Sequence, residues 1–110
     1  MFKKKYRLNP RIRLENTSRI QTVFFTLTLA KNQCTHNRYG FIASKRIDKR
    51  AVVRNRVKRR VRAAVEQMVS NVKNGYDMLF VLKVAAVGAR TDFLYKEIER
   101  IFKKEKLLLV

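Results

Sequence analysis

A stripe of apolar residues with helical spacing, in the middle of the chain, restricts the fold more than any other sequence feature. At 100° per residue, the apolar side chains of residues 53–72 gather on one side of a helical wheel. Valine is a mediocre helix former, so the stripe has to pack against another layer to stabilise the helix. The sequence predicts an amphipathic helix that starts at Arg50 and stops at Asn74 and Gly75. The stripe consists of Val53, Val57, Val61, Ala64, Val65, Met68 and Val72.

Three segments have the patterns of β-strands. In residues 23–29, Val, Phe or Leu at every odd position alternates with Phe or Thr at every even position, which predicts a strand with one apolar face. Residues 39–44 predict a second strand. The polar stretch 31–37 between them is too short for a crossover, so we expect the two strands to pair antiparallel. Residues 76–82 predict a buried strand.

The two ends of the chain carry different patterns. Residues 2–22 are polar and basic, with no sustained apolar period, and predict at most one helical turn. Thr91 and Asp92 are expected to open a last helix as its cap. The chain is therefore expected to divide into a basic arm over residues 1–16 and a single domain over residues 17–110. The apolar face of the last helix comprises Leu94, Ile98, Ile101 and Phe102.

Charge points to the class of partner. The 110 residues contain 27 Lys and Arg against 8 Asp and Glu, a formal charge of +19 that a polyanion would neutralise.

One cysteine, Cys34, cannot form an internal disulfide, and with one histidine, His36, it cannot complete a structural zinc site. No apolar run reaches the roughly 20 residues of a membrane span, and no secretory signal is evident. We expect a cytoplasmic protein with no membrane partner.

The positive charge is concentrated between residues 38 and 62, where Asp48 is the only acid. Arginine stays protonated and offers planar donor groups that match phosphate oxygens. The alternative is an ordinary solvated face, but such faces normally mix both signs of charge. Arginine cannot shuttle protons near neutral pH, and the eight acids are scattered, so any reaction requires chemistry from another molecule. Four arginines recur on successive helical turns: Arg54, Arg56, Arg59 and Arg62.

This segment resembles the signature of the bacterial ribonuclease P protein subunit. Ser44-Lys45-Arg46 is followed by the run Ala-Val-Val-Arg-Asn-Arg-Val-Lys-Arg over residues 51–59, and the flanking stretches 38–43, 75–82 and 91–104 are also similar to the family. The resemblance implies an α+β fold, a small two-layer sandwich with a mixed four-stranded sheet and a C-terminal helix. It also implies that the Arg-rich helix lies in a left-handed crossover, against the general rule for parallel strands.

The resemblance implies a function as well. The protein joins a catalytic RNA subunit, with 1:1 stoichiometry, and together they remove the 5′ leader from precursor tRNA. The RNA, and no site on the protein, holds the catalytic Mg²⁺, and the protein contributes no catalytic residue. The residues expected to bind RNA are Lys45, Arg46, Arg54, Asn55, Arg56, Lys58, Arg59 and Arg62.

The chain departs from the family near its start. Family members have a longer first helix with two aromatic residues that line a cleft for the leader, whereas residues 9–14 here are fewer and contain no aromatic residue. Phe24 is the candidate for stacking on a leader base, with core packing as its alternative role.

Two other functions fit the composition. A structural RNA-binding protein of ribosomal type would share the charge without a role in tRNA processing. A membrane-surface protein is a weaker alternative, because the apolar side of the basic helix lacks the Trp, Phe or Leu that anchor interfacial helices.

Overall fold

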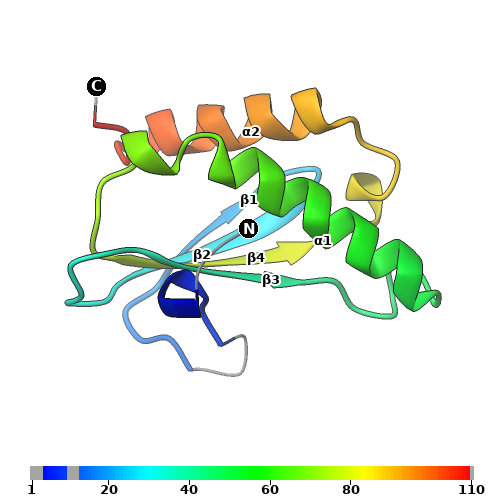
Figure 1. Ribbon diagram of the computed structural model, residues 1–110, viewed down its shortest axis with the longest axis horizontal. Coiled ribbons are helices and arrows are strands. Elements are labelled where there is room, and N and C mark those ends of the chain that lie inside the picture. The colour runs from blue at the N-terminus through cyan, green and yellow to red at the C-terminus, as the bar shows by residue number, and fades with distance from the viewer. Residues whose placement is uncertain (1–3, 10–12, 110) are drawn as a thin grey trace.

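The structure is a computed structural model that describes residues 4–9 and 13–109, and it has two layers. Both long helices lie on one face of a four-stranded sheet (Figure 1). The strands are β1 (Ser18–Gln21), β2 (Phe25–Lys31), β3 (Arg38–Ile42) and β4 (Tyr76–Leu82). The helices are α1 (Ala51–Glu66) and α2 (Thr91–Lys104), with single 3₁₀ turns η1 (Lys4–Tyr6), η2 (Val69–Asn71) and η3 (Val84–Ala86).

The sheet is mixed, with the strand order β1-β2-β4-β3. The pairs β1–β2 and β2–β4 are antiparallel, and β3–β4 is parallel. Helix α1 lies in the connection between the parallel strands β3 and β4. This arrangement confirms the expected α+β sandwich with a mixed four-stranded sheet, while the left hand of the crossover stays a prediction.

The predicted antiparallel pairing between the strand at residues 23–29 and the strand at residues 39–44, observed as β2 and β3, is wrong. β4 lies between β2 and β3, so the two strands are not neighbours. The intervening stretch 32–37 has to cross two strand spacings, about 10 Å, and six extended residues can reach roughly 20 Å. The argument from loop length excluded a crossover but did not exclude a later strand inserting between the two.

Strand β1 falls in the stretch for which at most one helical turn was predicted. It is a short polar edge strand with mostly exposed residues, and it leaves no apolar period to detect. The turn into β2 is held by the Thr22 hydroxyl, which accepts hydrogen bonds from the backbone N–H groups of Phe24 and Phe25 at 3.1 and 3.0 Å. Val23 therefore lies in this turn, 68% exposed, and does not join the apolar face of the strand as predicted.

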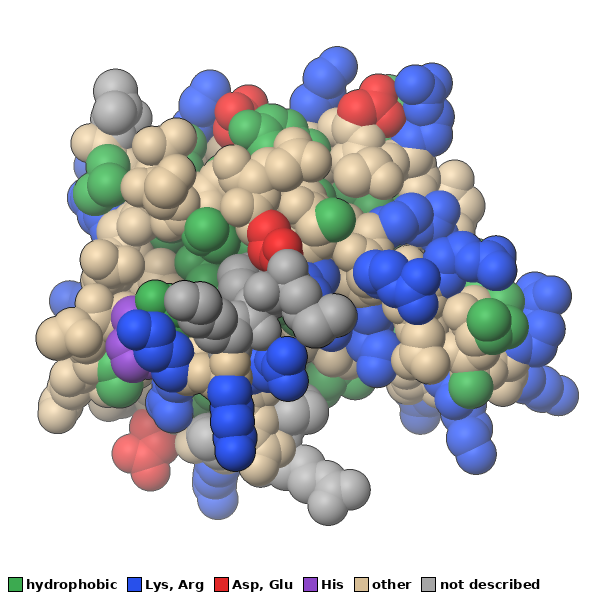
Figure 2. Space-filling model, in the orientation of Figure 1, with side chains coloured by type: hydrophobic (Ala, Val, Ile, Leu, Met, Phe, Trp, Pro, Cys, Tyr) green, Lys and Arg blue, Asp and Glu red, His purple; other side chains and the backbone are tan. Residues whose placement is uncertain are grey.

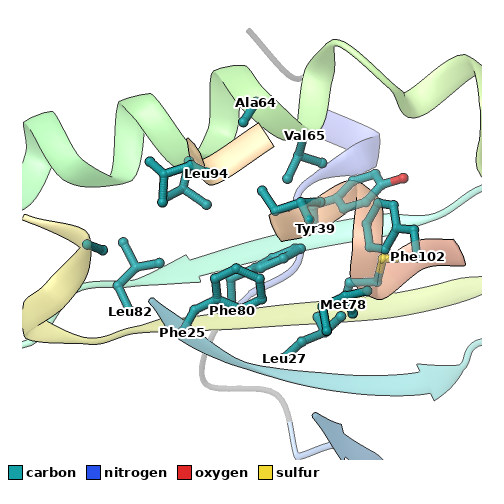
Figure 3. Close-up of a cluster of buried hydrophobic side chains, with 14 of the residues drawn as sticks. Phe25, Leu27, Tyr39, Ala64, Val65, Met78, Phe80, Leu82, Leu94 and Phe102 are labelled. Atoms are coloured by element: carbon teal, nitrogen blue, oxygen red, sulfur yellow. The ribbon is translucent and has the colours of Figure 1, made fainter. Parts of the chain in front are cut away.

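The core fills the space between the sheet and the two helices (Figure 3). Phe80 is its centre: its ring contacts Phe25 edge-on at 5.2 Å between centroids and stacks on Phe41 at 5.2 Å. The apolar stripes of both helices cover these rings, as the sequence predicts. The fully buried members include Phe25, Leu27, Met78 and Phe80 of the sheet, Val57, Val61, Ala64 and Val65 of α1, and Leu94, Ile98, Ile101 and Phe102 of α2.

Helix α1 is shorter than predicted. It ends at Glu66 and gives way to η2, although Met68 and Val72 beyond its end remain buried. Gly75 has a φ of 99°, the left-handed conformation that glycine tolerates, but it precedes β4 and does not close the helix. Helix α2 begins at the predicted place, yet Thr91 is its first helical residue and not the cap; Arg90 takes the cap position without a side-chain hydrogen bond.

The N-terminal segment adds to the outer edge of β3. The Leu8 amide donates to the Tyr39 carbonyl at 2.8 Å, and the Leu8 side chain is buried. A Cβ at Gly40 would lie 3.0 Å from the Leu79 Cδ1 atom and 3.1 Å from the Leu8 oxygen, so a larger residue here would crowd both neighbours. In the described ranges 4–9 and 13–109, neither helix is long and apolar enough to span a membrane.

Candidate nucleic-acid interface

Burial of the valine stripe turns the charged side of α1 outward. Asn55, Arg56 and Arg59 are exposed, whereas Arg54, Lys58 and Arg62 are half-buried. Figure 2 shows Lys and Arg side chains gathered on the right of the molecule, over the start of α1, with no acidic side chain among them in that view. The helix thus presents cations along one exposed side.

The loop before α1 extends this cationic surface. Lys45 and Arg46 are exposed on a turn in which the Ile47 amide donates to the Ser44 carbonyl at 3.1 Å. Asp48 accepts hydrogen bonds from the backbone and the guanidinium of Arg50, at 2.8, 3.1 and 3.0 Å. These hydrogen bonds lower the pKa of the Asp48 carboxyl to about 2, so it stays ionised. The single acid of the segment therefore orients Arg50.

Arg54 ties this loop to the helix. Its Nη1 atom donates to the carbonyl oxygens of Asp48 and Lys49, at 3.1 and 2.8 Å. These bonds leave other donors of the guanidinium for a ligand, because arginine has five N–H groups. Arg54 therefore combines the predicted phosphate contact with a role in holding the last residues of the loop, Asp48 and Lys49, against the start of α1. Sequence spacing gave no signal of this second role.

Arg62 is held against the sheet. Its guanidinium carbon lies 5.5 Å from the centroid of the Phe41 ring, within the range of a cation–π contact. Arg59 and Arg62 also line a shallow cavity of about 200 Å³ together with Ala63 and Glu66. The expected set from Lys45 to Arg62 thus lies on one helix and the loop that leads into it.

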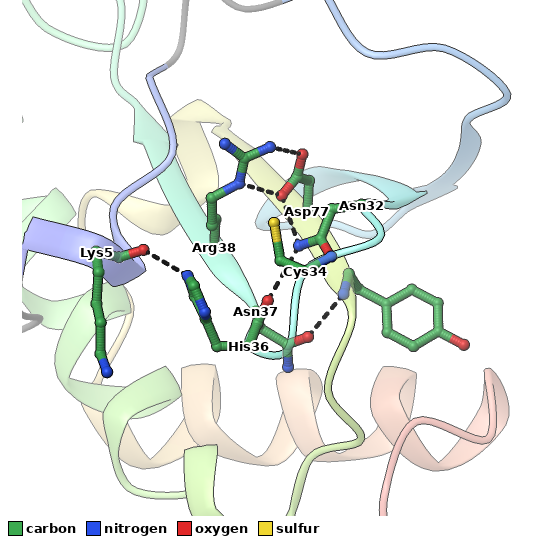
Figure 4. Close-up of polar contacts among 8 residues, drawn as sticks. Lys5, Asn32, Cys34, His36, Asn37, Arg38 and Asp77 are labelled. Atoms are coloured by element: carbon green, nitrogen blue, oxygen red, sulfur yellow. Dashed lines mark hydrogen bonds and ion pairs between the residues drawn. The ribbon is translucent and has the colours of Figure 1, made fainter.

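Two other arginines of the basic segment serve the fold. Arg38 donates to the buried carboxylate of Asp77 at 2.7 and 2.6 Å, which raises the pKa of Arg38, and Asn32 donates to the same carboxylate at 2.9 Å (Figure 4). Arg60 donates to the Val87 carbonyl, and its buried Nε atom has no partner among the described residues. Neither residue belongs to the predicted RNA-binding set.

Helix α2 has a different surface chemistry. Cations and acids are mixed along it, and ion pairs join Arg90, just before the helix, to Asp92 at 3.3 Å and Lys103 to Glu99 at 3.8 Å. Arg100 likewise donates to Glu97 at 2.6 Å. Such pairs compete with any external anion for the cations. The contrast singles out α1 and its preceding loop as the surface suited to a polyanion.

Phe24 lies beside α2. Its half-buried ring lines a shallow cavity of about 270 Å³ with Phe93, Lys96, Glu97 and Arg100. Phe93 is 50% exposed, so two aromatic rings border this hollow. In the part of the chain that the structure describes, no three His, Cys, Asp or Glu residues are placed to hold a metal ion.

Comparison with known proteins identifies the family. A model of the ribonuclease P family matches residues 2–106. The ribonuclease P protein component of Symbiobacterium thermophilum is 32% identical over 112 residues, which cover 97% of this chain and 96% of that protein. The protein of the same name from Fusobacterium nucleatum is 37% identical over 71% of this chain and 73% of its own length. The match with the Synechocystis protein component, 29% identical, spans 64% of that protein.

Solved structures agree at the level of the fold. An RNase P protein mutant from Staphylococcus aureus superimposes with a TM-score of 0.81, at 24% identity, over 96% of this chain and 92% of that one. The RNase P protein from Thermotoga maritima gives a TM-score of 0.73, at 17% identity, over 82% and 84%. With its matching sequence motif, relatives and fold, this chain belongs to the ribonuclease P protein family.

Proposed function

We propose that this chain binds the RNA subunit of ribonuclease P through the exposed face of α1 and the loop before it. As a member of its family, the chain assists that RNA in removing the 5′ leader of precursor tRNA. The observation that carries the proposal is the concentration of cations on α1 and the loop before it, where Asp48 and Glu66 are the acids, whereas several cations of α2 are paired with acids. Family membership also disfavours the alternative of a structural ribosomal protein.

The proposal divides the chemistry between protein and RNA. Arginine and lysine grip phosphates but do not transfer protons near neutral pH, so the protein supplies binding energy and position. Mg²⁺ prefers oxygen ligands and is commonly held through phosphates, which the RNA supplies in quantity. We therefore place the catalytic centre and its Mg²⁺ on the RNA subunit, in a 1:1 cytoplasmic complex that receives precursor tRNA.

A pair of substitutions tests the binding face. Replacing Arg56 and Arg59 together by Ala removes two exposed cations and leaves the buried stripe intact. Each lost phosphate contact should reduce the slope of log affinity against log salt by about 0.7 to 0.9, so the slope for the double variant should be smaller by about 1.4 to 1.8. The measurement is equilibrium binding to ribonuclease P RNA between about 50 and 200 mM salt.

The matched control is the double variant Lys103→Ala with Lys104→Ala, which removes the same charge from exposed positions on α2. It should bind the RNA nearly as well as the unaltered protein does. If the two double variants lose affinity equally, the proposed face has no special role and only net charge matters.

A cleavage assay tests the proposed function itself. At low Mg²⁺, adding the protein to ribonuclease P RNA should accelerate removal of the leader from precursor tRNA, because protein cations take over part of the phosphate neutralisation. Cleavage by the protein without RNA, or no acceleration of the RNA, would contradict the proposed division.

Phe24 remains our proposed contact for the leader. Its ring lies next to the half-exposed ring of Phe93, and both border a hollow lined also by Lys96 and by the ion-paired Glu97 and Arg100. Exposed aromatic rings suit a stacked base. Phe24→Leu keeps the apolar bulk but removes the flat ring. It should weaken the binding of precursors with a leader more than the binding of mature tRNA. Equal losses of affinity for both would exclude Phe24 from the leader contact.

A further inference from the structure

A third cavity lies beyond the C-terminal end of α1, whereas Lys45 and Arg46 precede the N-terminal end of that helix. It has a volume of about 300 Å³ and is formed where η1, the segment before β3 and the turn η2 meet. It is bounded by the aromatic residues Tyr6, His36 and Tyr39 and by the polar residues Asn37, Ser70 and Asn74. It shares no lining residue with the cationic face of α1 or with the hollow at Phe24.

The aromatic wall of this cavity is held in place. The Tyr6 and His36 rings meet edge to face, with centroids 5.4 Å apart and planes at 83°. His36 Nε2 lies 3.0 Å from the Lys5 carbonyl oxygen, a contact that Figure 4 shows. A carbonyl oxygen only accepts, so Nε2 carries the proton. The Lys5 ammonium lies 4.9 Å from the centroid of the Tyr6 ring, which places a cation next to this ring.

The floor of the cavity is rigid and polar. The buried Asn37 amide donates to the Lys73 carbonyl at 2.8 Å and to the Tyr39 hydroxyl at 3.1 Å, and it accepts from the Tyr76 amide at 2.8 Å. Burial raises the pKa of the Tyr39 hydroxyl, so this group stays neutral. At the rim, Ser70 and Asn74 are exposed and contribute a hydroxyl and an amide.

We propose that this cavity binds one unpaired nucleobase of an RNA partner. Aromatic rings in the wall, neutral donors and acceptors around them, and a lysine beside Tyr6 match a heteroaromatic base with a phosphate attached. No acidic residue lines the cavity, so nothing in its wall repels that phosphate. The cavity would add a base contact at the far end of the helix from the loop that contains Lys45. The inference rests on the proposed function for the supply of RNA, but binding of a mononucleotide can be measured without it.

Nuclear magnetic resonance of the full chain tests the proposal with AMP, CMP, GMP, UMP and inorganic phosphate as probes. At least one nucleotide should shift the backbone amides of residues 35–39 and 69–74, and inorganic phosphate should not. Tyr6→Ala should weaken the apparent affinity about tenfold, which corresponds to about 1.4 kcal/mol. Tyr6→Phe keeps the ring and should retain binding.

A filling substitution provides the matched pair. Ser70→Tyr places a ring in the cavity and should abolish the nucleotide shifts, whereas Asn71→Tyr, exposed in the same turn but outside the cavity lining, should leave them unchanged. The same spectra report whether each variant is folded. Equal shifts with phosphate, shifts confined to α1, or unimpaired binding by Ser70→Tyr would overturn the cavity proposal. Because the α1 double variant is assayed separately against RNA, these results would leave the proposed function standing.

Discussion

Neighbouring arginines on α1 have opposite roles at the scale of single residues. Arg59 is exposed, while Arg60 donates to the Val87 carbonyl and buries its Nε atom. The sequence shows both as members of one basic run, and the helical wheel placed only Arg59 in the binding set. The wheel could not show the acceptor of Arg60, because Val87 lies 27 positions away and reaches α1 only through the fold.

These two arginines should separate binding from stability. Arg60→Ala removes a hydrogen bond from a charged donor and should lower the free energy of unfolding by about 1 to 3 kcal/mol, with RNA affinity of the folded protein nearly unchanged. Arg59→Ala should weaken RNA binding and leave the free energy of unfolding nearly unchanged. Urea unfolding and RNA binding measured on both variants check this, and similar profiles for the two would contradict the assignment.

Asp48 predicts a pH dependence. Its pKa is about 2 in the folded protein and about 3.9 in an unfolded chain, so its contribution to stability is complete above about pH 4 and declines as the pH falls toward 2. The melting temperature of Asp48→Asn should therefore lie below that of the unaltered protein at about pH 5, and the gap should narrow by about pH 3. A gap that stays constant over this range would exclude the contact with Arg50 as its cause.

At the scale of elements, periodicity predicted both helices and the buried face of each. It also predicted strands at β2, β3 and β4, with β4 at its observed bounds. It missed β1, whose residues are polar, and it missed the end of α1, since Met68 and Val72 stay buried after the helix has stopped. Periodicity could not predict the strand order, because strand pairing depends on contacts between residues far apart in the chain.

The tight contact at Gly40 predicts how the N-terminal segment can be released. In Gly40→Ala the new methyl group would crowd the Leu79 side chain and the Leu8 backbone, so the segment should move away from β3. The Leu8 amide, which donates to Tyr39, should then exchange its hydrogen faster, while amides of α2 keep their protection. Unchanged exchange at Leu8 would show that the sheet absorbs the methyl group by other means.

At the scale of the whole molecule, the charge of +19 sets two opposing responses to salt. Self-repulsion destabilises the free protein, and salt screens it, so the melting temperature should rise between about 50 and 500 mM NaCl. RNA affinity should fall over the same range as counterions compete for the phosphates. Calorimetry and equilibrium binding in matched buffers measure the two trends, and a melting temperature that falls with salt would refute the repulsion argument.

The position of β4 in the middle of the sheet has a consequence for synthesis of the protein. Until residue 82 has left the ribosome, β2 and β3 have no strand between them, and the valine stripe of α1 has no complete sheet to cover. Translation proceeds at roughly 5 to 20 residues per second, so seconds pass between synthesis of the α1 segment and synthesis of β4. During that time the arginines of α1 are accessible to cellular polyanions. Closure of the domain is therefore a late event in synthesis, because it has to follow the emergence of β4.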